Sequence, residues 1–137
     1  MLKNNTVKVI GGGLAGSEAA YFLATHGIQV ELYDVKPTKM SPAHKSQDYA
    51  ELVCSNSLKS NDVYGNACGL MKEEMRILGS LIIESADKFR VPAGNALAVD
   101  REKFSQKVTD ILENMPNIEI IRREITRLEK VCKVAEA

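Results

Sequence analysis

A cluster of glycines near the N-terminus has the spacing of a phosphate-binding turn. Residues 11–16 read Gly-Gly-Gly-Leu-Ala-Gly and fit the pattern G-x-G-x-x-G, directly after the apolar run 6–10. In this pattern the first glycine permits a tight turn, the second lets backbone approach a pyrophosphate, and the third lets a helix pack closely on a strand. Backbone amides at the positive end of that helix then face the phosphates. The candidate cofactor-binding residues of this turn are Gly11, Gly12, Gly13, Leu14, Ala15 and Gly16.

An acidic residue follows where the ribose of a dinucleotide would lie. Asp34 ends an alternation of apolar and polar residues over 28–34. It comes about 20 residues after the glycines, the separation at which an acid accepts a hydrogen bond from the ribose 2′-hydroxyl. The acid therefore favours FAD or NAD over NADP. Spacing alone does not choose between FAD and NAD.

Cys54 is a candidate nucleophile. It lies in the polar stretch 50–60, which is rich in serine and asparagine. The thiolate is the reactive form of cysteine, and nearby cations lower the pKa of the thiol. The alternative is that Cys54 is a small buried hydrophobic residue, as free cysteines commonly are. The candidate cations near it in the sequence are His44, Lys45 and Lys59.

The composition excludes several classes of protein. Eighteen basic and eighteen acidic residues balance one another in 137, which excludes a strongly polycationic nucleic-acid binder but allows a local basic patch. No apolar run is long enough to span a membrane, and the first residues lack the arrangement of a signal peptide, so we expect a cytoplasmic protein without membrane contact. Three cysteines, none in a C-x-x-C pair, predict reduced thiols and no metal site.

The elements that position these residues predict an α/β fold with a Rossmann-like parallel sheet. The strand 6–10, a helix over 14–26 and the strand 28–34 form a βαβ unit, for which a right-handed crossover is expected. The region 36–69 carries proline, asparagine and glycine with few periodic apolar residues, which indicates a long functional loop. The later elements are predicted as a helix over 70–90, an extended stretch over 91–99, a helix that begins after Asp100, and a strand over 118–125.

Helical periodicity assigns an inner face to three of these helices. In the helix that Asp100 is expected to cap, this face comprises Phe104, Val108, Ile111, Leu112 and Met115. In the first helix the apolar face comprises Leu14, Ala15, Ala19, Phe22 and Leu23. In the helix over 70–90 the predicted inner face comprises Met71, Met75, Leu78, Leu81, Ile82, Ser85 and Phe89. Its predicted outer residues are Lys72, Glu73, Arg76 and Lys88. Gly79 is expected to be tolerated inside this helix at a cost of about 1 kcal/mol relative to alanine.

Three stretches of the sequence together resemble a known family. They read GGGLAGSEAAYFLATHGIQVELYDVKP, ELVCSNSLKSN and RVPAGNALAVDREKFS. They are similar to the N-terminal part of the folate- and FAD-dependent tRNA (uracil-5-)-methyltransferases (TrmFO), which are relatives of the GidA flavoproteins. The second and third stretches are specific, because generic Rossmann proteins lack them. The resemblance extends over about 7–126 and implies the N-terminal portion of a flavoprotein of the two-dinucleotide-binding type, with an incomplete parallel sheet.

The resemblance implies an activity in RNA modification. Members of this family methylate C5 of a uridine in the T-loop of tRNA. They take the one-carbon unit from 5,10-methylenetetrahydrofolate, and NAD(P)H recharges the FAD. Uracil C5 becomes nucleophilic when a thiolate adds at C6, which suits Cys54 as the catalytic thiol, although the step that uses it stays open.

The resemblance also implies roles for individual residues. The glycines of 11–16 would bind the FAD diphosphate, and Asp34 stands where the family has a glutamate on the ribose. Lys36 replaces a family arginine, which changes a planar fork into a point charge. Ile125 would offer backbone to the adenine. Arg101 would lie near the flavin or the substrate, or else be a solvated arginine at a helix start.

Two further arginines have an open role. Arg122 and Arg123 would either contact RNA phosphate or form a solvated strand end, and the second alternative is favoured because phosphate contacts need a larger basic face.

The chain departs from the family in its length. Members are about three times longer, so 137 residues suggest a fragment, a truncated product or a split subunit whose partner supplies the C-terminal portion. We expect an FAD-binding domain over 1–126, with the active-site loop 36–69 inserted, and a polar tail over 127–137. The alternatives are a noncatalytic dinucleotide-binding module, an NAD-dependent oxidoreductase domain, and a relative that acts on rRNA.

Overall fold

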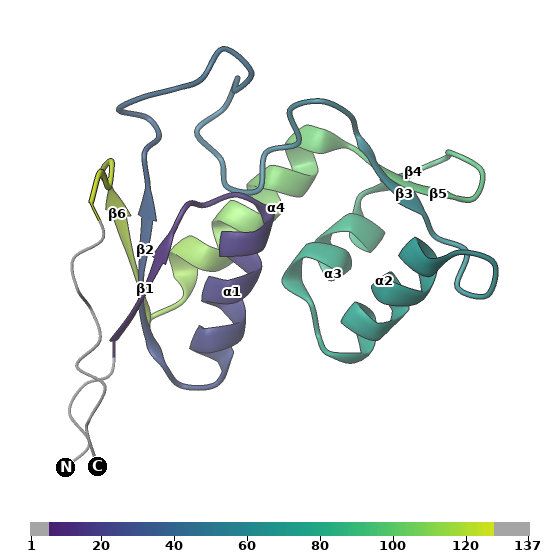
Figure 1. Cartoon of the computed structure of the whole chain (residues 1–137), viewed down its shortest axis with the longest axis horizontal. Helices are drawn as coiled ribbons and strands as arrows, with labels where there is room; N and C mark the ends of the chain where they lie inside the picture. The colour runs from purple at the N-terminus through teal and green to yellow at the C-terminus, as the bar shows by residue number, and fades with distance from the viewer. Residues whose placement is uncertain (1–5, 128–137) are drawn as a thin grey trace.

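A parallel three-stranded sheet positions the glycine turn, which follows the first strand of the sheet. In the computed structural model, which describes residues 6–127, the strands β1 (Thr6–Ile10), β2 (Gln29–Asp34) and β6 (Ile118–Arg122) lie in the order β1-β2-β6 (Figure 1). Both pairings are parallel. The central strand β2 is the most buried of the three, with four buried residues of six. The predicted α/β class and incomplete parallel sheet are confirmed, although the third strand ends at Arg122 rather than at 125.

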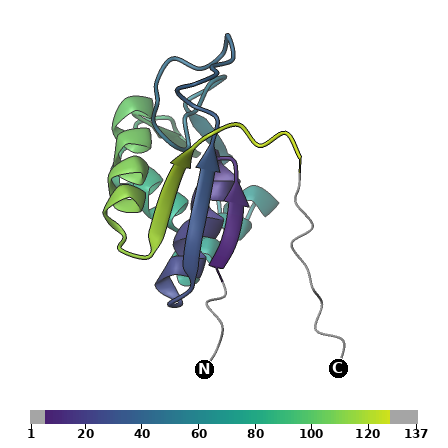
Figure 2. The ribbon, with the colours of Figure 1, turned by 90° about the vertical axis from the view of Figure 1, so that its left-hand side faces the viewer.

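Two helices cover one face of this sheet, and the other face is turned toward the viewer in Figure 2. They are α1 (Leu14–Thr25) and α4 (Arg101–Asn114). In α4 the Asp100 side chain accepts a hydrogen bond from the Lys103 amide at 3.2 Å, which caps the helix as predicted. The predicted inner face of α4 is confirmed at three buried positions, Phe104, Val108 and Leu112.

The inner face of α1 differs from the prediction. Its buried residues are small: Ser17, Ala20 and Ala24. Small side chains let the helix lie close to the sheet, so large ones are excluded from that face. Leu14 and Phe22 are 36% and 51% exposed and instead line a groove of about 600 Å³ between α1 and the following helices.

The single helix predicted over 70–90 is wrong, because two helices occupy this region. They are α2 (Ala67–Ile77) and α3 (Leu81–Lys88). Gly79 breaks the helix with a φ of +74°, a conformation that favours glycine, and the Ser80 hydroxyl then accepts a hydrogen bond from the Ile83 amide at 3.2 Å. Glu18 of α1 adds a second cap, since its carboxylate accepts hydrogen bonds from Ser80, Leu81 and Ile82 at 2.6–3.0 Å.

Burial on α2 also differs from the predicted faces. Met71 and Leu78 are 61% and 75% exposed, whereas Lys72, predicted outside, is 6% exposed. Its ammonium group donates to the carbonyls of Ser60 and Cys68 at 2.7 and 3.0 Å. Two carbonyl acceptors thus replace water around a buried cation, and the pKa of Lys72 is lowered by its burial.

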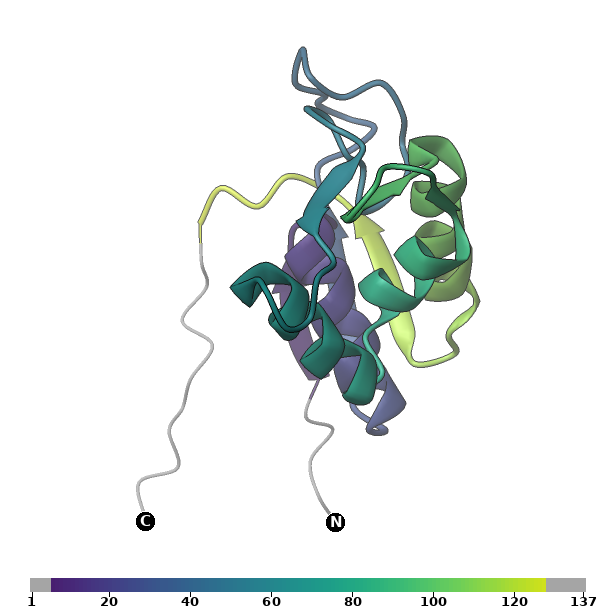
Figure 3. The same cartoon turned by 90° about the vertical axis from the view of Figure 1, so that its right-hand side faces the viewer.

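A small antiparallel sheet flanks α2 and α3 on the side turned to the viewer in Figure 3. Its strands lie in the order β3-β5-β4. The strands are β3 (Ser57–Ser60), β4 (Arg90–Val91) and β5 (Ala96–Val99). The predicted turn and extended stretch over 91–99 are confirmed, but the predicted loop 36–69 contains β3 and the first turn of α2. The predicted tail 127–137 lies outside the described residues, apart from Arg127.

Candidate functional site

Three glycines of the turn have three different surroundings. Gly11 has a φ of +101°, which makes the tight turn after β1. Gly13 precedes α1, and a Cβ atom there would meet nothing within 4 Å, so the space beside its Cα atom is open. A Cβ atom at Gly16 would overlap the carbonyl oxygen of Gly11. These are the surroundings that a tight turn, a phosphate approach and close helix packing require.

Gly12, the residue between the first two motif glycines, serves a different purpose. It is buried, and a Cβ atom there would overlap the ring of Tyr49 and lie 2.6 Å from Asp34 Oδ2. Its amide donates to that oxygen at 2.7 Å, and its carbonyl accepts from the Ala50 amide at 2.8 Å and from the Ser17 hydroxyl at 3.2 Å. Gly12 is therefore fixed from both sides, by β2 and by the loop after it.

Tyr49 is a residue that the sequence did not single out for the site. Its ring is fully buried against Gly12, and its amide donates to Thr109 Oγ1 of α4 at 2.8 Å. Its hydroxyl has no hydrogen-bond partner within the described residues, and burial raises the pKa of Tyr49 to about 12. The one available signal was a large aromatic residue in an otherwise polar loop.

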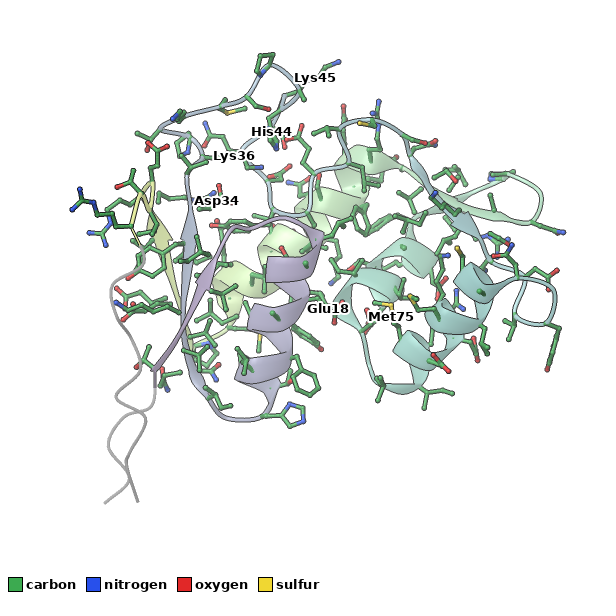
Figure 4. The ribbon with its side chains drawn as sticks, in the orientation of Figure 1. Glu18, Asp34, Lys36, His44, Lys45 and Met75 are labelled. Carbon is green, nitrogen blue, oxygen red and sulfur yellow. The ribbon has the colours of Figure 1, made fainter. Side chains whose placement is uncertain are left out.

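Asp34 lies at the end of β2 and is 6% exposed. One carboxylate oxygen accepts from the Gly12 amide and the other from the Lys36 amide, each at 2.7 Å. A carboxylate accepts about four hydrogen bonds, so Asp34 keeps capacity for a ribose hydroxyl while it holds the turn. Figure 4 shows Asp34 and Lys36 at the upper end of β2, with His44 and Lys45 in the loop above them.

A pocket of about 660 Å³ opens beside the glycine turn. This volume lies within the roughly 300–1,000 Å³ typical of ligand pockets. Its lining includes the predicted cofactor residues Gly11, Gly12, Gly13, Asp34, Lys36 and Ile125. Predicted residues that do not line it are Leu14, Ala15, Gly16 and Arg101. The pocket therefore joins the first turn, the end of β2 and the segment after β6.

The ammonium group of Lys36 points to the loop rather than standing free in this pocket. The side chain is 6% exposed, its Nζ donates to the Asp48 carbonyl, and it lies 3.7 Å from Glu51 Oε2. Burial acts to raise the pKa of Glu51. Hydrogen bonds from the Lys45 and Ser46 amides, with the positive charges nearby, outweigh burial and lower that pKa below its ordinary value.

Cys54 is exposed, so the alternative of a buried hydrophobic cysteine is wrong. It lines a cavity of about 450 Å³ together with Ser55, Asn56, Val99 and Arg101. The predicted cations His44, Lys45 and Lys59 do not line this cavity.

Arg101 is the cation that borders the Cys54 cavity. Its Nη1 donates to the Leu52 carbonyl at 3.3 Å, which connects the start of α4 to the cysteine segment. Of the two alternatives for Arg101, the exposed side chain at the start of α4 agrees with a solvated helix-start arginine, and it lies apart from the glycine pocket.

The two arginines at the end of β6 are engaged within the chain. The guanidinium of Arg122 stacks over Tyr49 at 4.3 Å and bonds to the Gln47 carbonyl at 3.2 Å. Arg123 lies 5.6 Å from the ring centre of Tyr33 and borders the glycine pocket. Over 6–127 the structure contains no group of three metal-ligating side chains and no helix that could cross a membrane.

The family model of glucose inhibited division protein A (GidA) matches residues 6–137. The chain is 60% identical over 122 residues to methylenetetrahydrofolate--tRNA-(uracil-5-)-methyltransferase TrmFO of Persephonella marina, covering 89% of this chain and 28% of the relative. The same-named protein of Fusobacterium nucleatum is 65% identical over 120 residues, covering 88% and 27%. The chain thus spans less than a third of these relatives.

A solved structure supports the fold. Aquifex aeolicus GidA superposes with a TM-score of 0.67 at 21% identity, covering 87% of this chain and 19% of that chain. At this identity the similarity concerns the arrangement of helices and strands.

Proposed function

Because this chain belongs to the glucose inhibited division protein A family, we propose that it is the FAD-binding portion of a tRNA (uracil-5-)-methyltransferase. One observation carries the proposal: Gly13 opens the start of α1 toward a pocket of about 660 Å³ that Asp34 and Ile125 also line. An open backbone at a helix N-terminus suits a diphosphate. The buried carboxylate nearby suits a ribose hydroxyl.

The residues present fit FAD in a defined way. The backbone of 11–13, which lines the pocket, would hold the diphosphate, with Asp34 on the ribose and the backbone of Ile125 on the adenine. Lys36 borders the same pocket, and Arg101 lies at the thiol cavity instead. Bound FAD would supply the reducing equivalents that convert a one-carbon unit into a methyl group.

Cys54 is the proposed catalytic thiol. Its exposure beside Arg101 and Asn56 allows a uracil ring to approach the sulfur. In one such step the thiolate would add at C6 of the uracil and make C5 nucleophilic toward the one-carbon donor. Loss of the C5 proton, departure of the donor nitrogen and addition of a hydride, drawn from reduced FAD, to the transferred carbon would then release the thiolate and leave the methyl group. We propose 5,10-methylenetetrahydrofolate as the donor, NAD(P)H as the reductant and the T-loop uridine of tRNA as the acceptor.

The whole reaction is proposed for a chain of the relatives' length. Residues 6–127 contain the glycine pocket and the Cys54 cavity. The relative from Persephonella marina is more than three times as long as this chain. For the 137-residue chain the proposal is FAD binding, with the rest supplied by a C-terminal portion or a separate chain. A noncatalytic dinucleotide-binding module is the alternative, and it predicts no role for Cys54.

Substitution at Gly13 tests the FAD proposal. Gly13→Asp places a carboxylate at the helix start, where aspartate is a good N-cap, so the fold should be kept or slightly stabilised. The same carboxylate would repel a diphosphate and should weaken FAD binding by roughly 100-fold, whereas Gly13→Ala has room for its methyl group and should bind within about tenfold of wild type. Binding is measured by titration of flavin absorbance or fluorescence. Equal affinity of Gly13→Asp and wild type would contradict the proposal.

The acceptor is tested in a chain of family length. Cys54→Ala should abolish formation of 5-methyluridine in transcripts of tRNA. Cys68→Ala, at the second cysteine that is exposed among residues 6–127, should leave it unchanged. Methylation of rRNA instead of tRNA would replace the proposed substrate, and undiminished methylation by Cys54→Ala would remove the thiol from the mechanism.

A further inference from the structure

We propose that Lys36 is a positioning residue for the cysteine segment, defined as residues 45–54, rather than a direct ligand of the cofactor. Its buried ammonium group binds Asp48 and Glu51 and so fixes the loop that leads to Cys54. The inference rests on the proposed function only in naming Cys54 as the reacting thiol.

Lys36 is held at both its backbone and the end of its side chain. Its amide is fixed to Asp34 Oδ1 at 2.7 Å, so the start of the side chain is tied to the end of β2. The ammonium group donates to the Asp48 carbonyl, and the Lys36 side chain is 6% exposed. A buried cation with protein partners is costly to withdraw, since it would lose both its carbonyl and its counter-ion.

Glu51 depends on this lysine. Its Oε1 accepts from the amides of Lys45 and Ser46 at 2.8 and 3.1 Å, which closes the segment into a turn. Its Oε2 is buried without a hydrogen bond among the described residues, and the Lys36 ammonium lies 3.7 Å away. Removal of that charge would leave a carboxylate buried with its negative charge uncompensated.

The segment then connects Lys36 to the thiol cavity. The Tyr49 and Ala50 amides donate to Thr109 and Gly12, and the Leu52 carbonyl accepts from Arg101. Cys54 follows Glu51 by three residues, a span of at most about 10 Å, so displacement of Glu51 is transmitted to the sulfur. Lys36 therefore acts on the thiol through Glu51 and the backbone.

The test uses the 137-residue chain without flavin, folate or RNA, so that failure of the proposed function leaves its result standing. Hydrogen exchange is followed for the Tyr49 and Ala50 amides, and the alkylation rates of Cys54 and Cys68 by iodoacetamide are followed by peptide mass spectrometry. Cys68, in the first turn of α2, is the internal control.

Lys36→Met should release the segment. We expect exchange of the two amides to accelerate by roughly tenfold or more, and alkylation of Cys54 relative to Cys68 to rise by about threefold or more. Lys36→Arg, which keeps the charge, should stay within about twofold of wild type on both measures. Lys39→Met is the control, because it removes an exposed lysine that borders the glycine pocket and pairs with Glu124. It should change neither the amide exchange nor the alkylation of Cys54.

A double substitution separates positioning from a general loss of packing. Lys36→Met with Glu51→Gln removes both charges, so it should recover part of the protection lost in Lys36→Met alone. Unchanged exchange and alkylation in Lys36→Met would overturn the inference, as would equal effects of Lys36→Met and Lys36→Arg. If Lys36→Met does not fold, Glu51→Gln alone decides the question: acceleration supports the inference, and wild-type rates overturn it.

Discussion

The βαβ unit and the α2–α3 region are held in place by different means. In the βαβ unit the close contacts are between backbone and small residues: Gly16 lies against the carbonyl of Gly11, and α1 faces the sheet with serine and alanine. In the α2–α3 region the apolar residues Leu81, Ile82 and Ala86 join the core, and charged side chains add further connections. Glu18 caps α3, and Lys72 binds two carbonyls. Added volume should therefore damage the first region, and removed charge should damage the second.

The largest effect is expected from added volume at the glycine turn. Gly16→Ala places a methyl group against the Gly11 carbonyl, so the turn or α1 has to shift, and the free energy of unfolding should fall by about 3 kcal/mol. Gly13→Ala is the matched control, since open space surrounds that position, and its effect should stay within about 1 kcal/mol. Urea unfolding followed by circular dichroism measures both. Equal effects would show that close approach does not define this region.

A smaller effect is expected from the loss of charge at the second region. Glu18→Ala removes the acceptor of three hydrogen bonds at the start of α3 and should lower the free energy of unfolding by about 2 kcal/mol. Glu74→Ala removes an exposed glutamate of α2 and should change it by no more than about 0.5 kcal/mol. Equal changes in the free energy of unfolding for the two substitutions would show that the Glu18 cap does not stabilise the start of α3.

The smallest effect is expected in the pH dependence of stability, through Glu51 in the loop between the two regions. The pKa of Glu51 in the folded chain lies below its ordinary 4.5, so its charge contributes stability above about pH 4.5, and that contribution is lost as pH falls through the folded pKa. Glu51→Gln lacks this contribution. From pH 6 to pH 3.5 wild type should therefore lose more stability than Glu51→Gln, as measured by thermal unfolding. Parallel losses in the two chains would show that the folded pKa of Glu51 is not lowered.

The sequence predicts the βαβ unit well because its determinants are local. The first strand, the glycine turn, the helix and the second strand follow one another within about 30 residues. Only the buried face of α1 differs from the prediction, because small residues rather than large apolar ones face the sheet. The break at Gly79 was missed although glycine at 79 and serine at 80 are local signals for it, because the apolar periodicity continues across them. The second cap of α3 comes from Glu18, which is 62 residues from Ser80 in sequence, and no local pattern contains it. Burial of Lys72 likewise requires a carbonyl of β3, which the helical periodicity of α2 does not contain.

The candidate site was predictable in part for the same reason. Gly11, Gly13 and Asp34 follow a spacing rule and line one pocket, whereas Gly16 of the same motif packs against the Gly11 carbonyl and does not line it. Arg101 and Cys54 border a separate cavity, and Arg101 also donates to the Leu52 carbonyl, whereas the cations nearest to Cys54 in sequence do not line that cavity. The direction of the Lys36 side chain depends on Glu51, whose role no spacing rule indicates.

The contact between Gly12 and Tyr49 has an evolutionary consequence. A methyl group at position 12 and an aromatic ring at position 49 compete for the same volume, so the two positions are sterically coupled. A homologue with alanine at position 12 should carry a smaller residue at position 49, and one that keeps tyrosine should keep glycine. A side chain at position 12 therefore requires a smaller residue at position 49 and a shift of the Asp34 carboxylate, whereas Gly13 beside it has room for a side chain without either change.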